Sequence, residues 1–305
     1  MAVGPGRPAM RLLVSSMSAG GRALRVGPSV VAALRGGGWD VEVVVTTAGD
    51  DPASMVAPGA DAVGALGGDG FLAAVAQGCH DHGAVLVPMP GGRGNDLCRA
   101  LGVGADPLQR ASGLAPLGSD RGGIGGSVRA IDGMWVRGDG AGRRLALGIV
   151  SLGLDARANL LANRSVLSNG PLAYAYGAFA ALATHRPAPI RARVDGEERD
   201  LSGWIASVSN SGRFGGGIVL VPGADMCDGV LEVCHVGPIP TRSALAALAR
   251  VVAGRGAHDP RIRVSSARLV EFLEPQGMTA MADGDVVATV PFTVEAAPGA
   301  VRVLV

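Results

Sequence analysis

Lysine is absent from this sequence, because all 27 basic residues among its 305 positions are arginine. A P-loop lysine, a Schiff base and a lysine general base each need an amine, and the arginine guanidinium keeps its proton at physiological pH. These mechanisms are therefore excluded.

The chain also has little net charge and few aromatic side chains. The formal net charge is +1, and aromatic residues make up 3% of the chain. Nucleic-acid binding draws on a basic surface and on rings that stack against bases. We therefore expect no nucleic-acid partner.

Cysteines and long apolar runs are few. Four cysteines occur, none in a CxxC pair, and a chain of this length can bury a core that folds without disulfides. No stretch of about 18 apolar residues is present, and the apolar stretch after Arg7 and Arg11 is too short for a signal peptide. We expect a cytoplasmic protein with reduced thiols, for which any membrane contact is peripheral.

The first part of the chain alternates apolar strands with helices. Strands are predicted at 10–16, 41–46, 62–66 and 84–89, and helices at 23–35 and 71–79. Glycine-rich turns join them, and such alternation is typical of a parallel sheet covered on both faces. We interpret Cys79-His80-Asp81-His82 as the end of the second helix rather than as a metal site.

From about Gly126 the pattern changes to short segments rich in Val, Ile and Leu, separated by Gly and Asp. This organisation predicts a β-sandwich. Helices are predicted to interrupt it at 171–184 and 242–252. The boundary between the two parts is placed near 131–134.

The first chemical signal is Gly67-Gly68-Asp69-Gly70, which follows a predicted strand and opens a predicted helix. Glycines let the backbone approach an anion closely, and the amides at a helix start carry partial positive charge, so this loop could cradle phosphate. The alternative is a tight turn in which Asp69 caps the helix.

A second glycine cluster, Pro88-Met89-Pro90-Gly91-Gly92-Arg93-Gly94-Asn95-Asp96, also follows a strand and precedes a short helix capped by Asn95 or Asp96. Two such loops on neighbouring strand ends could grip one polyphosphate.

These two loops, with the GGDG and PxGxGND spacing, resemble the nucleotide site of the diacylglycerol kinase catalytic-domain family, which includes bacterial lipid kinases and is related to sphingosine and ceramide kinases. The resemblance continues through Asn210 and Gly215-Gly216-Gly217, then Pro222 to Leu231, then Asp283-Gly284-Asp285 and Pro291. It covers about 290 residues.

The resemblance implies an N-terminal Rossmann-like parallel α/β nucleotide-binding domain at 10–132 and a C-terminal β-sandwich substrate domain at 133–290. It implies that the segment 291–305 returns to the first domain and that the active site is a cleft between the domains. ATP and Mg²⁺ are the implied cofactors.

Residue roles also come from the resemblance. Asp283 would be the base that accepts the proton of the substrate hydroxyl, and Asp225, Asp228 and the carbonyl of Val230 would hold Mg²⁺. The implied contacts with ATP are Thr46, Gly67, Gly68, Asp69, Gly70, Arg93, Gly94, Asn95 and Asp96.

Some positions depart from the family pattern. Phe71 and Arg93 stand where threonines are usual, Asp285 replaces a glutamate, and the N-terminal NPxSG element is represented by Ser15-Ser16-Met17-Ser18-Ala19. A guanidinium binds phosphate bidentately, so Arg93 is predicted to take over from the missing threonine.

The predicted activity is transfer of the γ-phosphate of ATP to a hydroxyl of a lipid such as diacylglycerol or a sphingoid-like alcohol. Alternatives are a small-metabolite acceptor, kinship with NAD kinases, and a non-catalytic nucleotide or lipid binder. A homodimer is compatible with the sequence. Tyr174, Tyr176 and Phe179 are assigned to core packing, the alternative being the entrance for an acyl chain.

Overall fold

The computed structural model describes residues 8–116, 127–138, 140, 142–164, 170–255 and 259–305, so Arg7 lies outside the described residues. The chain divides into two compact units. Unit 1 is Met1–Ile131 together with Ala300–Val305, and unit 2 is Asp132–Gly299. Among the described residues, no helix combines the length and the apolar character needed to cross a membrane.

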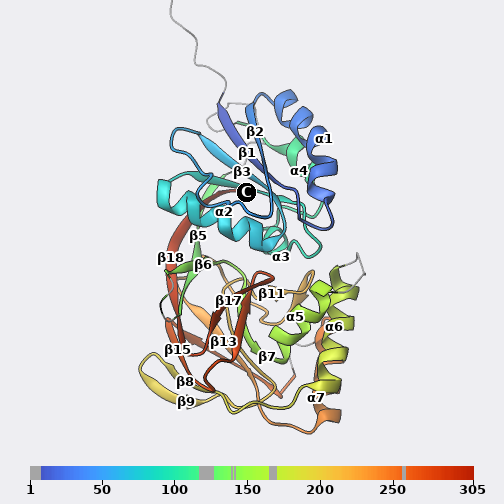
Figure 1. The fold of residues 1–305 in the computed structure, drawn as a ribbon, viewed down its shortest axis with the longest axis vertical. Helices are drawn as coiled ribbons and strands as arrows, with labels where there is room; N and C mark the ends of the chain where they lie inside the picture. The colour runs from blue at the N-terminus through green and yellow to red at the C-terminus, as the bar shows by residue number, and fades with distance from the viewer. Residues whose placement is uncertain (1–7, 117–126, 139, 141, 165–169, 256–258) are drawn as a thin grey trace, which may run out of the picture. The chain divides into compact units, whose positions relative to one another are not determined.

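Unit 1 is a parallel sheet with helices around it (Figure 1). Its strand order is β2-β1-β3-β4, followed by the end of β18 beside β4. The strands are β1 (Ala9–Ser15), β2 (Asp40–Thr46), β3 (Ala62–Gly67), β4 (Val85–Pro90) and β18 (Phe292–Leu304). The helices are α1 (Arg22–Gly36), α2 (Asp69–His82), α3 (Asp96–Ala100) and α4 (Pro107–Gly113).

The strand order reverses direction between β1 and β3. The chain runs from β1 through α1 to β2 on one side, and from β3 through α2 to β4 on the other. Since such crossovers are right-handed, α1 and α2 belong to opposite faces of the sheet. With both faces covered, β3 and β4 are buried along their whole length. Ligands of open α/β sheets bind where the order reverses, at the carboxyl ends of the strands.

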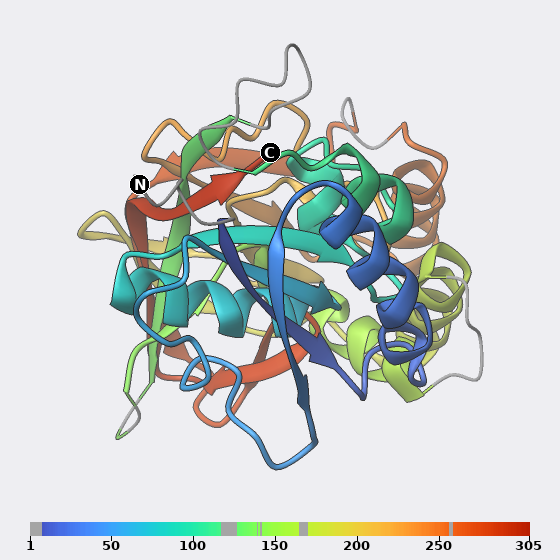
Figure 2. The same ribbon diagram turned by 90° about the horizontal axis from the view of Figure 1, so that it is seen from above.

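Apolar side chains of α1, α4 and the strands form the core on one face of this sheet. Leu12, Val30, Leu34, Trp39 and Leu66 are all fully buried in it. Figure 2 views the sheet from above. The predicted parallel α/β architecture is confirmed.

Unit 2 contains two antiparallel sheets that pack face to face. The first has the order β14-β13-β10-β7-β16-β17, and the second runs through β18-β15-β8-β9 with β5 and β6 at its side. Their inner faces share one apolar core, so the predicted β-sandwich is confirmed. The strands are β5 (Val128–Gly138), β6 (Arg144–Ala146), β7 (Ile149–Gly153), β8 (Arg191–Val194), β9 (Glu197–Asp200), β10 (Ile205–Ser209), β13 (Leu231–Val236), β14 (Ile262–Ala267), β15 (Leu269–Glu274), β16 (Thr279–Ala282) and β17 (Asp285–Thr289).

A small hairpin, β11 (Arg213–Phe214) with β12 (Ile218–Val219), stands apart from these sheets. The described residues of unit 2 also form three helices: α5 (Leu154–Arg164), α6 (Gly170–Thr184) and α7 (Thr241–Val252). They share an apolar cluster with residues of β7, β10 and β13. We call these three helices the helical layer. Two of them, α6 and α7, match predicted helices, whereas α5 was not predicted.

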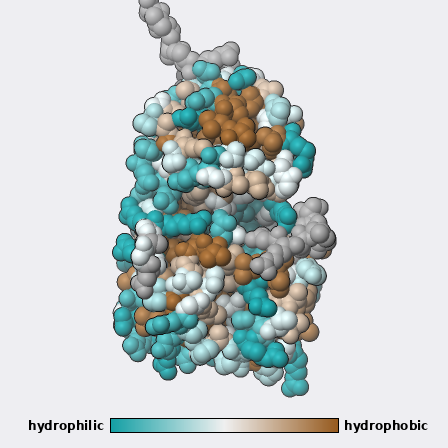
Figure 3. Space-filling view, in the orientation of Figure 1, coloured by the Kyte–Doolittle hydropathy of each residue, from teal (hydrophilic) through white to brown (hydrophobic). Residues whose placement is uncertain are grey.

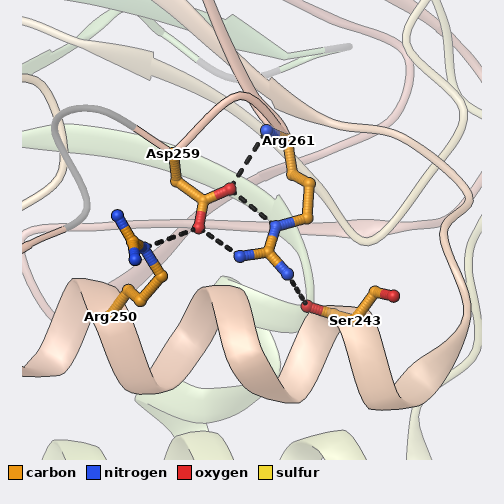
Figure 4. Close-up of polar contacts among 4 residues, drawn as sticks. All are labelled: Ser243, Arg250, Asp259 and Arg261. Atoms are coloured by element: carbon orange, nitrogen blue, oxygen red, sulfur yellow. Dashed lines mark hydrogen bonds and ion pairs between the residues drawn. The ribbon is translucent and has the colours of Figure 1, made fainter.

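A buried carboxylate fixes α7 to the start of β14 (Figure 4). Asp259 is 3% exposed, and its Oδ1 accepts from Arg261 Nε at 2.6 Å while its Oδ2 lies 3.2 Å from Arg250 Nε. Arg261 also donates to the Ser243 carbonyl at 3.0 Å. The hydrogen bond from Arg261 is the main cause that holds the pKa of Asp259 below its ordinary value.

Asp259→Asn should therefore destabilise the protein by about 2 kcal/mol, because it leaves two arginines without their shared carboxylate. A lowered pKa means that this contribution exists above the unfolded value of 3.8 and disappears as the pH falls. Thermal unfolding at pH 7 and pH 3 measures it. The difference between parent and variant should shrink at pH 3, and a constant difference would contradict the assignment.

Candidate active site

The loops that follow β3 and β4 press against each other at the carboxyl end of the unit 1 sheet. Gly91 N donates to Gly67 O at 2.7 Å. A Cβ on Gly92 would lie 2.5 Å from Gly68 Cα, and one on Gly91 would lie 2.8 Å from Gly67 N. Only glycine allows this approach, so the two predicted loops do come together as one backbone surface.

The loop after β1 joins them at the point where the strand order reverses. Gly68 N donates to Ser18 Oγ at 3.0 Å, and Ser18 Oγ donates to Ser15 Oγ at 2.8 Å. Ser15 and Ser18 belong to the segment that diverges from the family's NPxSG element. Their two hydroxyls, hydrogen-bonded in series, thus contact the GGDG loop. Three loops of unit 1 therefore meet at this place.

Gly68 differs from its glycine neighbours because packing does not require it. Its backbone is extended, with φ of −89°, and a Cβ there would meet Gly92 Cα at 3.6 Å and Ser18 Oγ at 3.7 Å. These are ordinary contact distances. The space beside Gly68 is kept open without a structural need, as expected where a ligand approaches the backbone.

Side-chain hydrogen bonds of Asp69 and Asn95 fix the conformation of the two glycine loops. Asp69 Oδ1 accepts from Leu97 N at 3.0 Å and so caps α3, whereas burial raises the pKa of Asp69. Asn95 has φ of 53°, accepts from Gly92 N at 2.8 Å and donates to Gly92 O at 3.2 Å. The alternative in which Asp69 caps the helix that it opens is wrong, because α2 has no side-chain cap and Asp69 binds the neighbouring helix α3 instead.

The remaining predicted contacts with ATP surround this surface. Thr46 ends β2 and is buried, with its Oγ1 donating to Val14 O at 3.4 Å. Gly70 lies in the first turn of α2. Arg93 and Gly94 lie between β4 and α3, Asp96 begins α3, and all three are partly buried. Phe71 occupies the position of the family threonine, and its ring packs on Gly67, where a Cβ would lie 2.4 Å from Phe71 Cδ1.

Asp283 lies in the two-residue turn between β16 and β17 of unit 2. Its φ is 51° and that of Gly284 is 92°, which is the primed turn that Asp-Gly favours in hairpins. The carboxylate accepts from two backbone amides, Leu147 N at 3.0 Å and Gly148 N at 2.9 Å. A Cβ on Gly148 would lie 2.5 Å from Asp283 Oδ1, so a side chain there would displace the carboxylate from this position.

Asn210 braces the segment that holds Asp283. Its backbone N donates to Gly148 O at 2.9 Å, and its side-chain amide donates to the carbonyls of Leu147 and Asp132, both at 3.0 Å. Asn210 is completely buried. The asparagine of the family pattern therefore orients the two amides that fix Asp283.

The predicted Mg²⁺ ligands form consecutive turns before β13. Asp225 Oδ1 accepts from Cys227 N at 3.0 Å, and Asp228 Oδ1 accepts from Val230 N at 3.0 Å. Both aspartates are exposed. In the described part of the chain, no three His, Cys, Asp or Glu side chains gather as a metal site, so the predicted set rests on two carboxylates and one carbonyl.

Two further acids near these turns were not predicted. Asp132 is buried and accepts from Gly229 N and Gly299 N, both at 2.7 Å, which fixes the turn at Asp228. Glu232 has a buried Oε2 with no hydrogen-bond partner. Burial, followed by the charges of Asp228 and Asp225, raises the pKa of Glu232 to about 7. Neither residue stands in a motif, so no sequence pattern pointed to them.

Glu232→Gln tests this charge cluster. A raised pKa means that the stability contribution of Glu232 is complete below its ordinary pKa of 4.5 and is lost as the pH rises through about 7. Between pH 5 and pH 8 the melting temperature of the parent should fall further than that of the variant. Exposed Glu295→Gln is the control and should keep the parental slope. Equal slopes in parent and Glu232→Gln would contradict the assignment.

Comparison with known proteins assigns the family. Residues 9–121 match the family model of the diacylglycerol kinase catalytic domain, and residues 148–305 match the "YegS C-terminal NAD kinase beta sandwich-like domain". The chain is 30% identical over 300 residues to "Diacylglycerol kinase" of Mycobacterium tuberculosis H37Rv, covering 96% of this chain and 93% of that protein.

It is also 30% identical over 312 residues to "Probable lipid kinase YegS-like" of Stenotrophomonas maltophilia K279a, covering 97% of this chain and 95% of that one. A crystal structure of a diacylglycerol kinase from Bacillus anthracis Sterne superposes with a TM-score of 0.72 at 17% identity, covering 97% of this chain and 96% of that chain. The structural likeness shows the shared fold. Together with the two family models and the identity along nearly the whole chain, it makes this protein a member of the diacylglycerol kinase family of lipid kinases.

Proposed function

We propose that this kinase transfers the γ-phosphate of ATP, with Mg²⁺, to a hydroxyl of a lipid such as diacylglycerol or a sphingoid-like alcohol. The observation that carries the proposal is the meeting of three loops at the reversal of strand order in unit 1. Phosphoryl transfer depends on positioning and on charge neutralisation rather than on covalent work by the protein. A rigid surface of backbone amides suits that task.

In this proposal the polyphosphate lies against the loops at Gly67–Gly70 and Gly91–Asp96. Amides at the start of α2 and in the glycine loops would donate to phosphate oxygens, and Arg93 would add a charge-assisted contact. Asp69 and Asn95 act indirectly here, because their side chains already bind the backbone of α3 and of the second loop. Their role is to keep the cradle in shape.

The residues before β13 fit a divalent cation by their chemistry. Asp225, Asp228 and the Val230 carbonyl are hard oxygen ligands of the kind that Mg²⁺ prefers. Glu232 lies near them with a buried, unpartnered Oε2, and burial, followed by the charges of Asp228 and Asp225, raises its pKa. Negative charge therefore gathers there. A cation held by these residues would offset that charge. When bound, Mg²⁺ supplies neutralisation of negative charge in a kinase.

Asp283 is proposed as the base. An aspartate is too weak a base to ionise an alcohol in advance, so it would orient the acceptor hydroxyl and take its proton late in the transfer. Two backbone amides hold its carboxylate in one orientation, so the side chain is already positioned for this role.

The test is ATP turnover, with and without Mg²⁺, against diacylglycerol, a sphingoid base, other glycerol lipids, small alcohols and NAD. Phosphorylation of a lipid supports the proposal, and faster phosphorylation of a small alcohol or of NAD overturns the lipid acceptor. ATP binding by calorimetry without turnover on any acceptor would favour the non-catalytic alternative.

A further inference from the structure

The helical layer carries large apolar side chains toward solvent. On α6, Leu172, Tyr176 and Phe179 follow at spacings of four and three residues, so they share one side of the helix. Their exposed fractions are 60%, 56% and 43%. We call these three residues the α6 stripe. A helix that faces only water carries polar residues on that side, so an aligned apolar stripe indicates a contact surface. The side chain of Tyr174 lies outside the described part.

Charge in the same layer is of one sign. Its three helices contain four arginines and a single acid, Asp155. Asp155 is buried and accepts a hydrogen bond from Ser151 Oγ, so it contributes nothing to the outer surface. Arg157 is exposed and donates to Thr184 at the end of α6, and exposed Arg186 follows two residues later. The stripe therefore has arginines at one end, and the single carboxylate of the three helices, that of Asp155, is buried.

An apolar cavity lies beneath these helices. Its lining includes Leu154 and Ala158 of α5, Ala178 of α6 and Val251 of α7, and the buried Trp204. Most of this lining is hydrocarbon, so the space disfavours a polar group.

We propose that the α6 stripe, with Arg157 and Arg186, seats this kinase on an anionic bilayer from which the acceptor lipid is taken. The choice of a bilayer rests on the proposed lipid acceptor. Tyr and Phe side chains settle in the boundary between headgroups and acyl chains, and arginines beside them attract anionic headgroups. A helix that lies on a membrane presents this combination of apolar and cationic residues.

The experiment is co-sedimentation of the full chain with vesicles of phosphatidylglycerol and phosphatidylcholine, without nucleotide. The double variant Tyr176→Ser with Phe179→Ser should bind at least about tenfold more weakly, since it removes two interfacial aromatic side chains. Arg186→Glu should weaken binding by roughly fivefold or more and only on anionic vesicles, because one arginine near such a surface contributes on the order of 1 kcal/mol.

The control replaces an equally exposed apolar pair of unit 1, Val43 and Val45, with serine. These residues of β2 are 41% and 47% exposed, and Figure 3 shows an apolar patch over this part of unit 1. The control should bind vesicles as the parent does. Equal binding by the parent and by the Tyr176 and Phe179 double variant would overturn the proposal. So would a change of oligomeric state in sedimentation velocity with vesicle binding intact, which would make the stripe a contact between copies.

Activity on a short-chain diacylglycerol dispersed as monomers separates this inference from the proposed function. The double variant should equal the parent there and lose activity only on vesicle-borne lipid. Loss on both forms would place the stripe in the catalytic machinery and overturn the docking role. If the parent phosphorylates no lipid in either form, the proposed lipid acceptor is wrong. The docking proposal is still tested in that case, because vesicle binding is measured without turnover.

Discussion

Asp283→Asn should lower kcat by about 10²- to 10⁴-fold while ATP binding stays almost unchanged, because loss of a general base has an effect of this size. The exchange also has a structural cost, since both carboxylate oxygens accept backbone amides and asparagine offers only one acceptor. One lost hydrogen bond is worth about 1 kcal/mol. The variant should therefore melt slightly lower and remain folded during the assay.

Asp195→Asn is a closely matched control. Asp195 and Gly196 form the turn between β8 and β9 with φ of 48° and 88°, almost the backbone of the Asp283 turn. Asp195 also accepts from two amides, Arg268 N at 2.9 Å and Leu269 N at 2.8 Å, although both reach the same oxygen, Oδ1. It should keep parental kcat. If Asp283→Asn retains more than about a tenth of kcat, or if both variants lose kcat equally, Asp283 is a turn residue and not the base.

Gly68→Val should weaken binding of Mg-ATP by roughly 10- to 100-fold, the equivalent of one or two charge-assisted hydrogen bonds. The extended backbone at Gly68 accepts a side chain, and its Cβ would meet only ordinary contacts. The valine would therefore block the proposed phosphate surface without disturbing the fold. Calorimetric titration with Mg-ATP measures the loss.

Gly113→Val serves as the control for this change, because a Cβ at Gly113 meets nothing within 4 Å. It should bind Mg-ATP as the parent does. Gly92→Ala provides the contrast, since its Cβ would lie 2.5 Å from Gly68 Cα and should disturb the loop itself. Unchanged affinity in a folded Gly68→Val protein would move the nucleotide site elsewhere.

The architecture was predictable wherever glycine turns separated clear apolar segments. Helix α5 was missed for a packing reason. A Cβ on Gly177 of α6 would lie 2.4 Å from Ala158 O and 2.8 Å from Ala162 N, so α5 and α6 approach through small residues. Because alanine faces the contact, α5 lacks the strong apolar period that sequence reading depends on.

Local motifs identified the loops of the candidate site but not the contacts that hold them. The two glycine loops were predicted to act together, and their backbones do meet. The link from Asn210 through residues 147 and 148 to Asp283 joins segments far apart in sequence, and no local spacing encodes it. In the sequence, Glu232 is an ordinary polar residue of an alternating strand. Its interaction with the charges of Asp225 and Asp228 becomes visible only in the folded structure. The family prediction is confirmed, whereas the roles of individual residues stay predictions.

The pairing of β18 with β4 leaves the sheet of unit 1 incomplete until the last residues of the chain have been synthesised. Arg302 lies beside Val85 and Val303 beside Leu86, so the sheet of unit 1 gains this strand only after some 200 further residues have been synthesised. During that time β4 would present an unpaired edge, which is a template for aggregation. Contacts this distant in sequence also slow folding. An expressed fragment that stops near Ile131 would keep that edge permanently, so separate study of the first unit calls for a circular permutant that carries residues 300–305.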